Sequence, residues 1–338
     1  MTHSRLLLSF AAAVPAMLLS ALLTWALRPL LLKIAPARPT ARSSHSEPTP
    51  QGGGIAVIAA TLASATAVMV LAAAPGLSVP VTVFAATLFM AAVGFADDIR
   101  SIAVPPRLLL QGMAVAAVVL AAPEDMRIVP PCPFWLERTI LLIAGIWFVN
   151  LVNFMDGLDL MTVAEIVPVA GALVLLGWRD ELAMPATLSA AALFGAMLGF
   201  APFNRPVARI FLGDVGSLPI GLITGWCLIE LAWHQQLTAA LLLPLYYLAD
   251  ATVTLLRRIA NGEPFWTAHR THYYQRATDN GFQARQVVSE VFALNLLLAA
   301  LAIASTVAVS KVAGILLLAA GGIATTLLMR RFARPRNG

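Results

Sequence analysis

The chain has 338 residues, of which 59% are hydrophobic and only 12% are charged. Soluble domains carry about 25% charged residues, so this composition excludes an ordinary soluble enzyme and indicates that lipid surrounds most of the chain. The net charge of +5 suits anionic partners in general, and no nucleic acid is expected among them.

Apolar runs long enough to cross a bilayer recur along the whole chain. A helix of about 20 apolar residues spans the hydrocarbon core, and about eleven runs meet that length. They lie near residues 6–27, 54–74, 79–96, 107–122, 139–155, 161–178, 183–201, 215–233, 238–256, 287–309 and 312–329. The sequence therefore predicts an all-α polytopic membrane protein with 10–11 transmembrane helices, formed by residues 1–338 as one domain.

The basic residues predict how these helices are oriented. If the connector after the first helix is cytoplasmic, most of the 22 Lys and Arg residues lie on the cytoplasmic side. This excess predicts a periplasmic N-terminus and a cytoplasmic C-terminus. The polar connectors near 33–53, 97–107, 153–160, 202–215 and 257–286 then all lie on the cytoplasmic face.

Acidic residues stand at the ends of two of these runs. Asp97 and Asp98 are adjacent in GFADDIRS, and Asp214 opens a helix in RIFLGDVGS. Charged side chains at the edge of lipid are costly, and carboxylate oxygens suit Mg²⁺ with its phosphate partners. A helix start also offers free backbone amides to a phosphate. Solvated helix ends and simple helix caps are the structural alternatives.

The segment NLVNFMDGLDL combines amides and acids. Asn150, Asn153 and Asp156 follow one another at a spacing of three, which places them roughly on one helix face, and Asp159 comes next. Such a set offers oxygen ligands and hydrogen-bond donors to a sugar or a nucleotide. A plain helix-capping arrangement is the alternative.

The connector AHRTHYYQRA is rich in cationic side chains. It holds His269 and His272 with Arg270 and Arg276, a combination that suits anionic phosphates through charge-assisted hydrogen bonds. A basic anchor at the membrane surface would explain the arginines but not the two histidines.

The segment SSHSEPTPQGGG, with His45 and Gly53, precedes the second run. Its glycines leave the backbone open to a phosphate, although a plain linker is the simpler interpretation. Acids for Mg²⁺, cations for phosphates and amides for a sugar are together the parts that phosphoryl transfer requires. A secondary transporter, the alternative from another class, would place ionisable groups near mid-membrane in two similar halves, a pattern that the sequence does not show.

In this order, the five motifs resemble those of the polyprenyl-phosphate N-acetylhexosamine-1-phosphate transferases. That family includes the phospho-MurNAc-pentapeptide translocase and the transferases that initiate O-antigen synthesis. The resemblance implies transfer of a sugar-1-phosphate from a UDP-N-acetylhexosamine to undecaprenyl phosphate, with release of UMP. It also implies Mg²⁺, or Mn²⁺ in its place, and an active site on the cytoplasmic face of the bacterial inner membrane. A homodimer is compatible with it.

Matching positions carry the implied roles. Asp97, Asp98, Asp156, His269 and His272 would be catalytic, with Asp97 or Asp98 deprotonating the lipid phosphate or acting as nucleophile. Asp214, Asp97 and Asp98 would hold the metal. Substrate would be bound by Asn150, Asn153, Asp159, Arg270, Arg276, His45 and Gly53. The sequence HRTHYYQR lacks the triple histidine of the translocase, which favours an O-antigen-initiating enzyme, keeps peptidoglycan synthesis as the alternative and leaves the sugar open.

Overall fold

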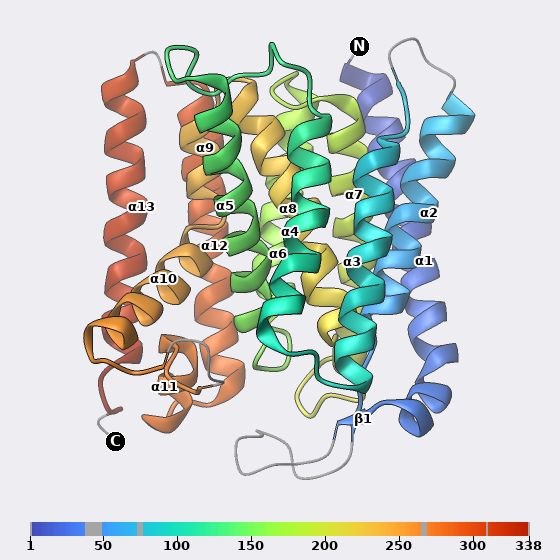
Figure 1. The fold of residues 1–338 in the computed structure, drawn as a ribbon, viewed down its shortest axis with the longest axis vertical. Coiled ribbons are helices and arrows are strands. Elements are labelled where there is room, and N and C mark those ends of the chain that lie inside the picture. The colour runs from blue at the N-terminus through green and yellow to red at the C-terminus, as the bar shows by residue number, and fades with distance from the viewer. Residues whose placement is uncertain (1, 38–48, 73–76, 265–268, 309, 337–338) are drawn as a thin grey trace.

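The computed structural model describes residues 2–37, 49–72, 77–264, 269–308 and 310–336. In this part of the chain the protein is a bundle of helices that run side by side along one common direction (Figure 1). The one sheet among these residues is an antiparallel pair of two-residue strands, in which Pro36 pairs with Pro50 and Ala37 with Thr49.

The elements follow in chain order. They are α1 (Thr2–Ile34), β1 (Pro36–Ala37), β2 (Thr49–Pro50), α2 (Gly54–Ala72), α3 (Val81–Ile99), α4 (Val104–Ala121), α5 (Phe134–Phe154), α6 (Met161–Trp178), α7 (Met184–Phe200), the 3₁₀ turn η1 (Ala201–Phe203), α8 (Asp214–Trp233), α9 (Leu237–Leu242), α10 (Leu245–Ala260), α11 (Tyr273–Asp279), α12 (Ala284–Thr306) and α13 (Lys311–Phe332).

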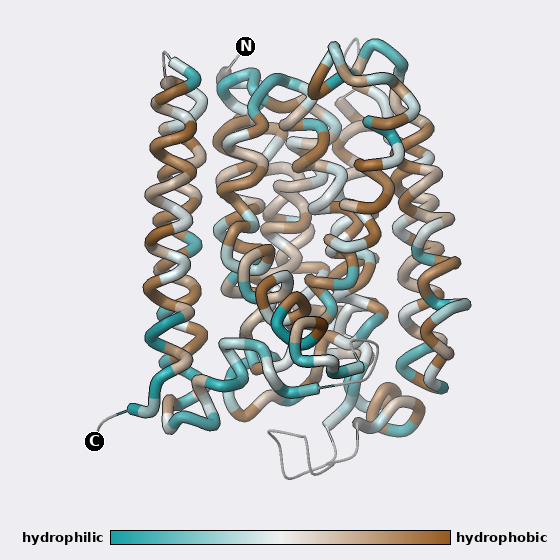
Figure 2. Tube along the Cα trace, turned by 60° about the vertical axis from the view of Figure 1, so that its left-hand side comes forward, coloured by the Kyte–Doolittle hydropathy of each residue, from teal (hydrophilic) through white to brown (hydrophobic). Residues whose placement is uncertain are grey.

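Ten helices within the described residues are long and apolar enough to cross a membrane. Hydrophobic residues predominate along the middle of the bundle, and hydrophilic residues gather toward its two ends (Figure 2). The protein is therefore an all-α, multi-pass membrane protein, as the sequence predicts.

The continuous helix expected near 238–256 is not present. The structure instead has α9 and α10, separated at Leu243 and Pro244. Proline has no backbone N–H to donate, and its ring clashes with the preceding turn, so it interrupts a helical ladder. The two termini lie at opposite ends of the bundle (Figure 1).

Two glycines allow other helices to meet the start of α8. A Cβ at Gly94 of α3 would lie 2.2 Å from the carbonyl oxygen of Asp214, and one at Gly54 of α2 would lie 2.1 Å from the Cα of Gly216. Any larger residue would push the backbones apart. These contacts bring the ends of α2, α3 and α8 together at one point.

Candidate active site

The predicted acids Asp98 and Asp214 come together at the start of α8, although they are 116 residues apart in the chain. Asp98, near the end of α3, accepts hydrogen bonds from the backbone N–H groups of Asp214 and Val215 at 2.9 and 3.0 Å. A carboxylate at a helix N-terminus satisfies free amides and complements the positive end of the helix dipole. Asp98 thus holds α8 against α3.

A third donor reaches Asp98 from the segment before α2. The side-chain amide of Gln51 donates to the Asp98 carboxylate. Gln51 is placed there because its segment pairs with the chain before α8: Phe211 N–H donates to Pro50 O at 2.9 Å, and Gly54 N–H donates to Leu212 O at 2.8 Å. The PTPQGGG and RIFLGD motifs therefore form one unit beside Asp98.

Asp97 and Asp214 are the two acids that lie within hydrogen-bonding reach of each other. Asp97 also accepts from Arg107 at 2.7 Å and from the backbone N–H of Ile102 at 2.5 Å. On the other side, Asn153 donates to Asp214 Oδ1 at 2.7 Å. Two carboxyl groups in such proximity share a proton or a cation, because two ionised carboxylates repel each other.

Asp156 lies in the turn between α5 and α6, where Thr162 donates a hydrogen bond to its Oδ1. Burial raises the pKa of the Asp156 carboxyl to about 7, and the charges of Asp98 and Asp159 add to the rise. Asp159 accepts from the backbone N–H of Ala208 at 3.0 Å. Asp156 is therefore an acid whose ionisation falls close to neutral pH.

A cavity of about 470 Å³ opens beside these groups. Its lining includes five residues that the sequence predicted for the site, namely Asn153, Asp156, Asp159, Asp214 and Arg270. We call it the polar cavity, because acids, amides and an arginine share its lining.

The histidine segment is anchored by an acid of α10. Asp250 is fully buried and accepts from the backbone N–H groups of Tyr273 and Tyr274 at 2.9 and 3.1 Å, at the start of α11. Its Oδ1 also lies 3.4 Å from Nδ1 of His272. The hydroxyl of Tyr274 donates to Phe154 O at 3.0 Å, which ties α11 to the end of α5.

His269 stacks on His272 with the ring centroids 4.9 Å apart. Burial lowers the pKa of His269 to about 4, and His272 and Arg258 contribute further. The lowered pKa favours the neutral imidazole of His269 in the ligand-free protein.

Comparison with known proteins shows the family of the sequence. The sequence model of glycosyl transferase family 4 matches residues 80–232. The phospho-N-acetylmuramoyl-pentapeptide-transferase of Shouchella clausii is 31% identical over 237 residues, which are 64% of this chain and 70% of that protein. The chain belongs to glycosyl transferase family 4.

Two further relatives match over more of the chain. The decaprenyl-phosphate N-acetylglucosaminephosphotransferase of Mycolicibacterium smegmatis is 27% identical over 298 residues, covering 76% of this chain and 72% of that protein. A probable undecaprenyl-phosphate N-acetylglucosaminyl 1-phosphate transferase of Bacillus subtilis is 25% identical over 309 residues, covering 86% and 83%.

Several residues predicted for the site of this glycosyl transferase family 4 protein are not among those that line the cavity. Asn150 is buried between α4 and α5, where it donates to Gln111 at 2.7 Å. Gly53 packs against Phe200, and its N–H donates to Phe211 O. Arg276 lies over the ring of Tyr273 at 5.3 Å. His272 is only 4% exposed, and His45 lies outside the described residues.

Four residues that sequence reasoning missed belong to the site. Gln51 and Gln275 line the cavity, Thr162 bonds Asp156, and Asp250 holds α11. Asp250 was the one with a clear signal, since it is a single acid inside an apolar run. Such residues in membrane proteins are usually functional.

The acids of the site do not by themselves form a complete set of metal ligands. No group of three or more His, Cys, Asp or Glu side chains within the described ranges has the geometry to hold a metal ion. However, Mg²⁺ normally binds one or two carboxylates and completes its shell with waters and substrate phosphates. Asp97 and Asp214, in mutual contact and with oxygen donors only, fit that pattern.

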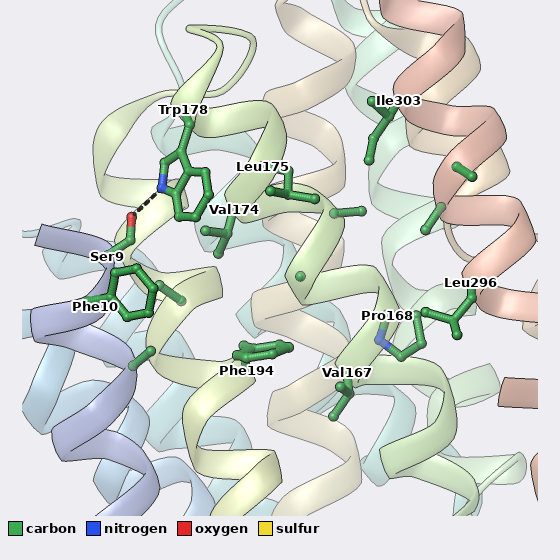
Figure 3. A pocket seen from close by; sticks show the side chains of 16 residues that line it. Ser9, Phe10, Val167, Pro168, Val174, Leu175, Trp178, Phe194, Leu296 and Ile303 are labelled. Carbon is green, nitrogen blue, oxygen red and sulfur yellow. Dashed lines mark hydrogen bonds between the residues drawn. The ribbon is translucent and has the colours of Figure 1, made fainter. Parts of the chain in front are cut away.

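A second cavity of about 480 Å³ lies between α1, α6, α7 and α12 (Figure 3). Its lining is apolar apart from Ser9, whose hydroxyl accepts from Trp178 Nε1 at 3.0 Å. The lining contains no acid, base or nucleophile beyond that paired hydroxyl. The five predicted site residues named above therefore line the polar cavity and not this one.

Proposed function

We propose that this protein transfers an N-acetylhexosamine-1-phosphate from a UDP-sugar to undecaprenyl phosphate. The products would be a polyprenyl-diphosphate-linked sugar and UMP. The proposal is supported by the relatives' names, which describe polyprenyl-phosphate acceptors and N-acetylglucosamine phosphate transfer.

The observation that carries the proposal is the meeting of Asp97, Asp98 and Asp214 beside a polar cavity at one end of an apolar bundle. A site there lies at the boundary between lipid and water. It can therefore receive one substrate from the membrane and the other from solution, as this transfer requires.

In the reaction, an oxygen of the lipid phosphate would attack the β-phosphorus of the UDP-sugar. The new bond joins that oxygen to the β-phosphorus, and the bond between the β-phosphorus and the bridging oxygen breaks. The bridging oxygen leaves with UMP. Because the reaction gathers negative charge at one place, most of the catalysis consists of positioning and electrostatic stabilisation.

Asp156 is the residue best suited to take up the proton of the lipid phosphate. A general base works best when its pKa lies near the working pH, and the pKa of Asp156 is about 7. Asp98, to which the resemblance gave this role jointly with Asp97, already accepts three hydrogen bonds. It is better suited to positioning Asp214.

Asp214 and Asp97 would hold the Mg²⁺ ion that the family resemblance implies. Such an ion, when bound, neutralises charge on the diphosphate. Asn153 orients Asp214 through the 2.7 Å hydrogen bond, and Arg270 in the cavity lining offers a positive charge to the diphosphate.

We place this site on the cytoplasmic face of the inner membrane. Sugar nucleotides are found in the cytoplasm, and the excess of Lys and Arg falls in the connectors at this end. The C-terminus lies at the same end of the bundle (Figure 1), so it would also be cytoplasmic.

The proposed pathway role is the first step in building a cell-surface polysaccharide of the O-antigen type. The HRTHYYQR segment supports this branch, and the N-acetylglucosamine-type relatives match over more of the chain. Peptidoglycan synthesis is the second candidate, because the pentapeptide transferase of Shouchella clausii has the higher identity of the three relatives reported.

The deciding experiment incubates purified protein with undecaprenyl phosphate, Mg²⁺ and radiolabelled UDP-sugars. The panel should include UDP-GlcNAc, other UDP-N-acetylhexosamines and UDP-MurNAc-pentapeptide, with labelled lipid and UMP as readouts. Asp214→Asn should abolish transfer, whereas Asp180→Asn, an exposed acid paired with Arg5, should not. Absence of labelled lipid with every donor would refute the proposal, and labelling from the pentapeptide donor alone would select the second candidate.

A further inference from the structure

Two acids of this protein each hold the start of a helix beside the site. Asp98 accepts the first two backbone N–H groups of α8, at 2.9 and 3.0 Å. Asp250 accepts those of Tyr273 and Tyr274 in α11, at 2.9 and 3.1 Å. The first acid fixes the metal-binding side, and the second fixes the histidine side.

Asp250 has more partners than a simple cap needs. In addition to the two backbone donors, its Oδ2 accepts from the Tyr246 hydroxyl at 3.2 Å, and its Oδ1 accepts from Thr254 at 3.3 Å. Its relative exposure is 0%. A carboxylate removed from water to this degree is held in one position by every donor around it.

His272 is the remaining contact of Asp250. Its Nδ1 lies 3.4 Å from Asp250 Oδ1, within ion-pair distance, and this buried nitrogen makes no hydrogen bond to any residue that the structure describes. The imidazole also packs against the His269 ring at 4.9 Å, the Tyr274 ring at 5.9 Å and the Phe154 ring at 6.4 Å. A carboxylate facing Nδ1 favours the tautomer with its proton on Nδ1 and leaves Nε2 for other partners.

We propose that Asp250 is a positioning residue that acts through His272. It fixes the orientation and tautomer of the imidazole, and it places the segment that starts at His269 against the polar cavity. His272 would then present Nε2 to the diphosphate of the sugar nucleotide. The inference rests on the proposed transferase function.

A merely structural role for Asp250 makes a different prediction from a role through His272. If Asp250 only stabilised the fold, its loss and the loss of His272 would reduce activity independently. If Asp250 acts through His272, the loss of Asp250 costs little once His272 has gone. A double-mutant cycle separates the two, because coupled residues depart from additivity.

The test uses full-length protein and kinetics with UDP-GlcNAc, or with the best donor from the panel, and undecaprenyl phosphate. Asp250→Asn and His272→Ala should each lower kcat/KM about tenfold or more, because each removes one side of the contact between the carboxylate and the imidazole. The double variant should fall within about twofold of His272→Ala. Asp180→Asn, the same chemical change at an exposed ion pair, should match the wild type.

If Asp250→Asn fails to fold, Tyr246→Phe is a milder test of the role of Asp250, because it removes only the hydroxyl that donates to Asp250 at 3.2 Å. It should lower kcat/KM of the wild type but not of His272→Ala. Multiplicative losses in the double variants, or wild-type activity in Asp250→Asn, would overturn the inference. If the wild type transfers no sugar phosphate, the proposed function fails instead, so the two failures are distinguishable.

Discussion

The hydrogen bond from Thr162 to Asp156 allows the proposed general base to be adjusted without touching its charge. Thr162→Val keeps the shape of the side chain and removes the donor. That donor favours the ionised carboxylate, so its loss must raise the pKa of Asp156 above the value of about 7. A hydrogen bond to a charged group is worth about 1.5–3 kcal/mol, and one pKa unit corresponds to about 1.4 kcal/mol.

The expected shift is about one pKa unit, at the lower end of this range, because Asp156 lines the cavity and water there can replace part of the lost hydrogen bond. The pH profile of kcat/KM reports ionisations of the free enzyme. In the wild type, kcat/KM should rise with pH through about 7 as Asp156 loses its proton. In Thr162→Val, the rising limb should move to about pH 8.

Two controls accompany this measurement. Asp156→Asn should remove the limb together with most of the activity. Thr61→Val, which removes a hydroxyl bonded to Val57 O inside α2, should leave the profile unchanged. A limb that stays in place or moves to lower pH in Thr162→Val would refute the assignment of Asp156 as the base.

The close contacts at glycines and the metal give further predictions. Gly94→Ala would put a Cβ 2.2 Å from Asp214 O. It should lower transfer more than tenfold and reduce the unfolding temperature, because overpacking costs about 1–3 kcal/mol. Wild-type kinetics in this variant would contradict the close packing of α3 on α8. Gly157→Ala would put a Cβ 2.1 Å from the Tyr274 hydroxyl and should impair transfer by displacing α11, as thermal unfolding and kinetics would detect. Gly322→Ala, with open space around it, is the matched control and should be neutral. EDTA should abolish transfer and Mg²⁺ or Mn²⁺ should restore it; activity in a chelated sample would remove the metal from the proposal.

Hydrophobicity alone predicted ten of the spanning helices, but it did not predict the break at Pro244. Pro15, Pro168 and Pro219 lie inside continuous helices, so a proline in an apolar run does not by itself reveal an interruption. Whether the ladder breaks depends on how neighbouring helices pack against it, and one sequence does not contain that information.

The site was predictable in its chemistry and less so in its geometry. The motifs predicted that Asp98 and Asp214 lie near each other, and the backbone N–H of Asp214 donates to Asp98. Asn150 did not join Asn153, because its amide donates instead to Gln111 of α4 and to the backbone of its own helix at Ile146. The link from Gln51 to Asp98 depends on backbone pairing with Phe211, a contact between distant segments that composition and periodicity do not reveal.

The backbone contacts at Gly54 and Gly94 have a consequence for how the protein changes shape during turnover. Because these glycines touch the first turn of α8 without intervening side chains, that turn cannot slide without collision. The start of α11, in contrast, makes hydrogen bonds from Tyr273 and Tyr274 to side-chain and backbone acceptors, which can open and re-form. We therefore expect α11 to move when substrate binds and the acids at the start of α8 to stay in place. Amide exchange should then slow at α11 rather than at α8 when a sugar nucleotide binds.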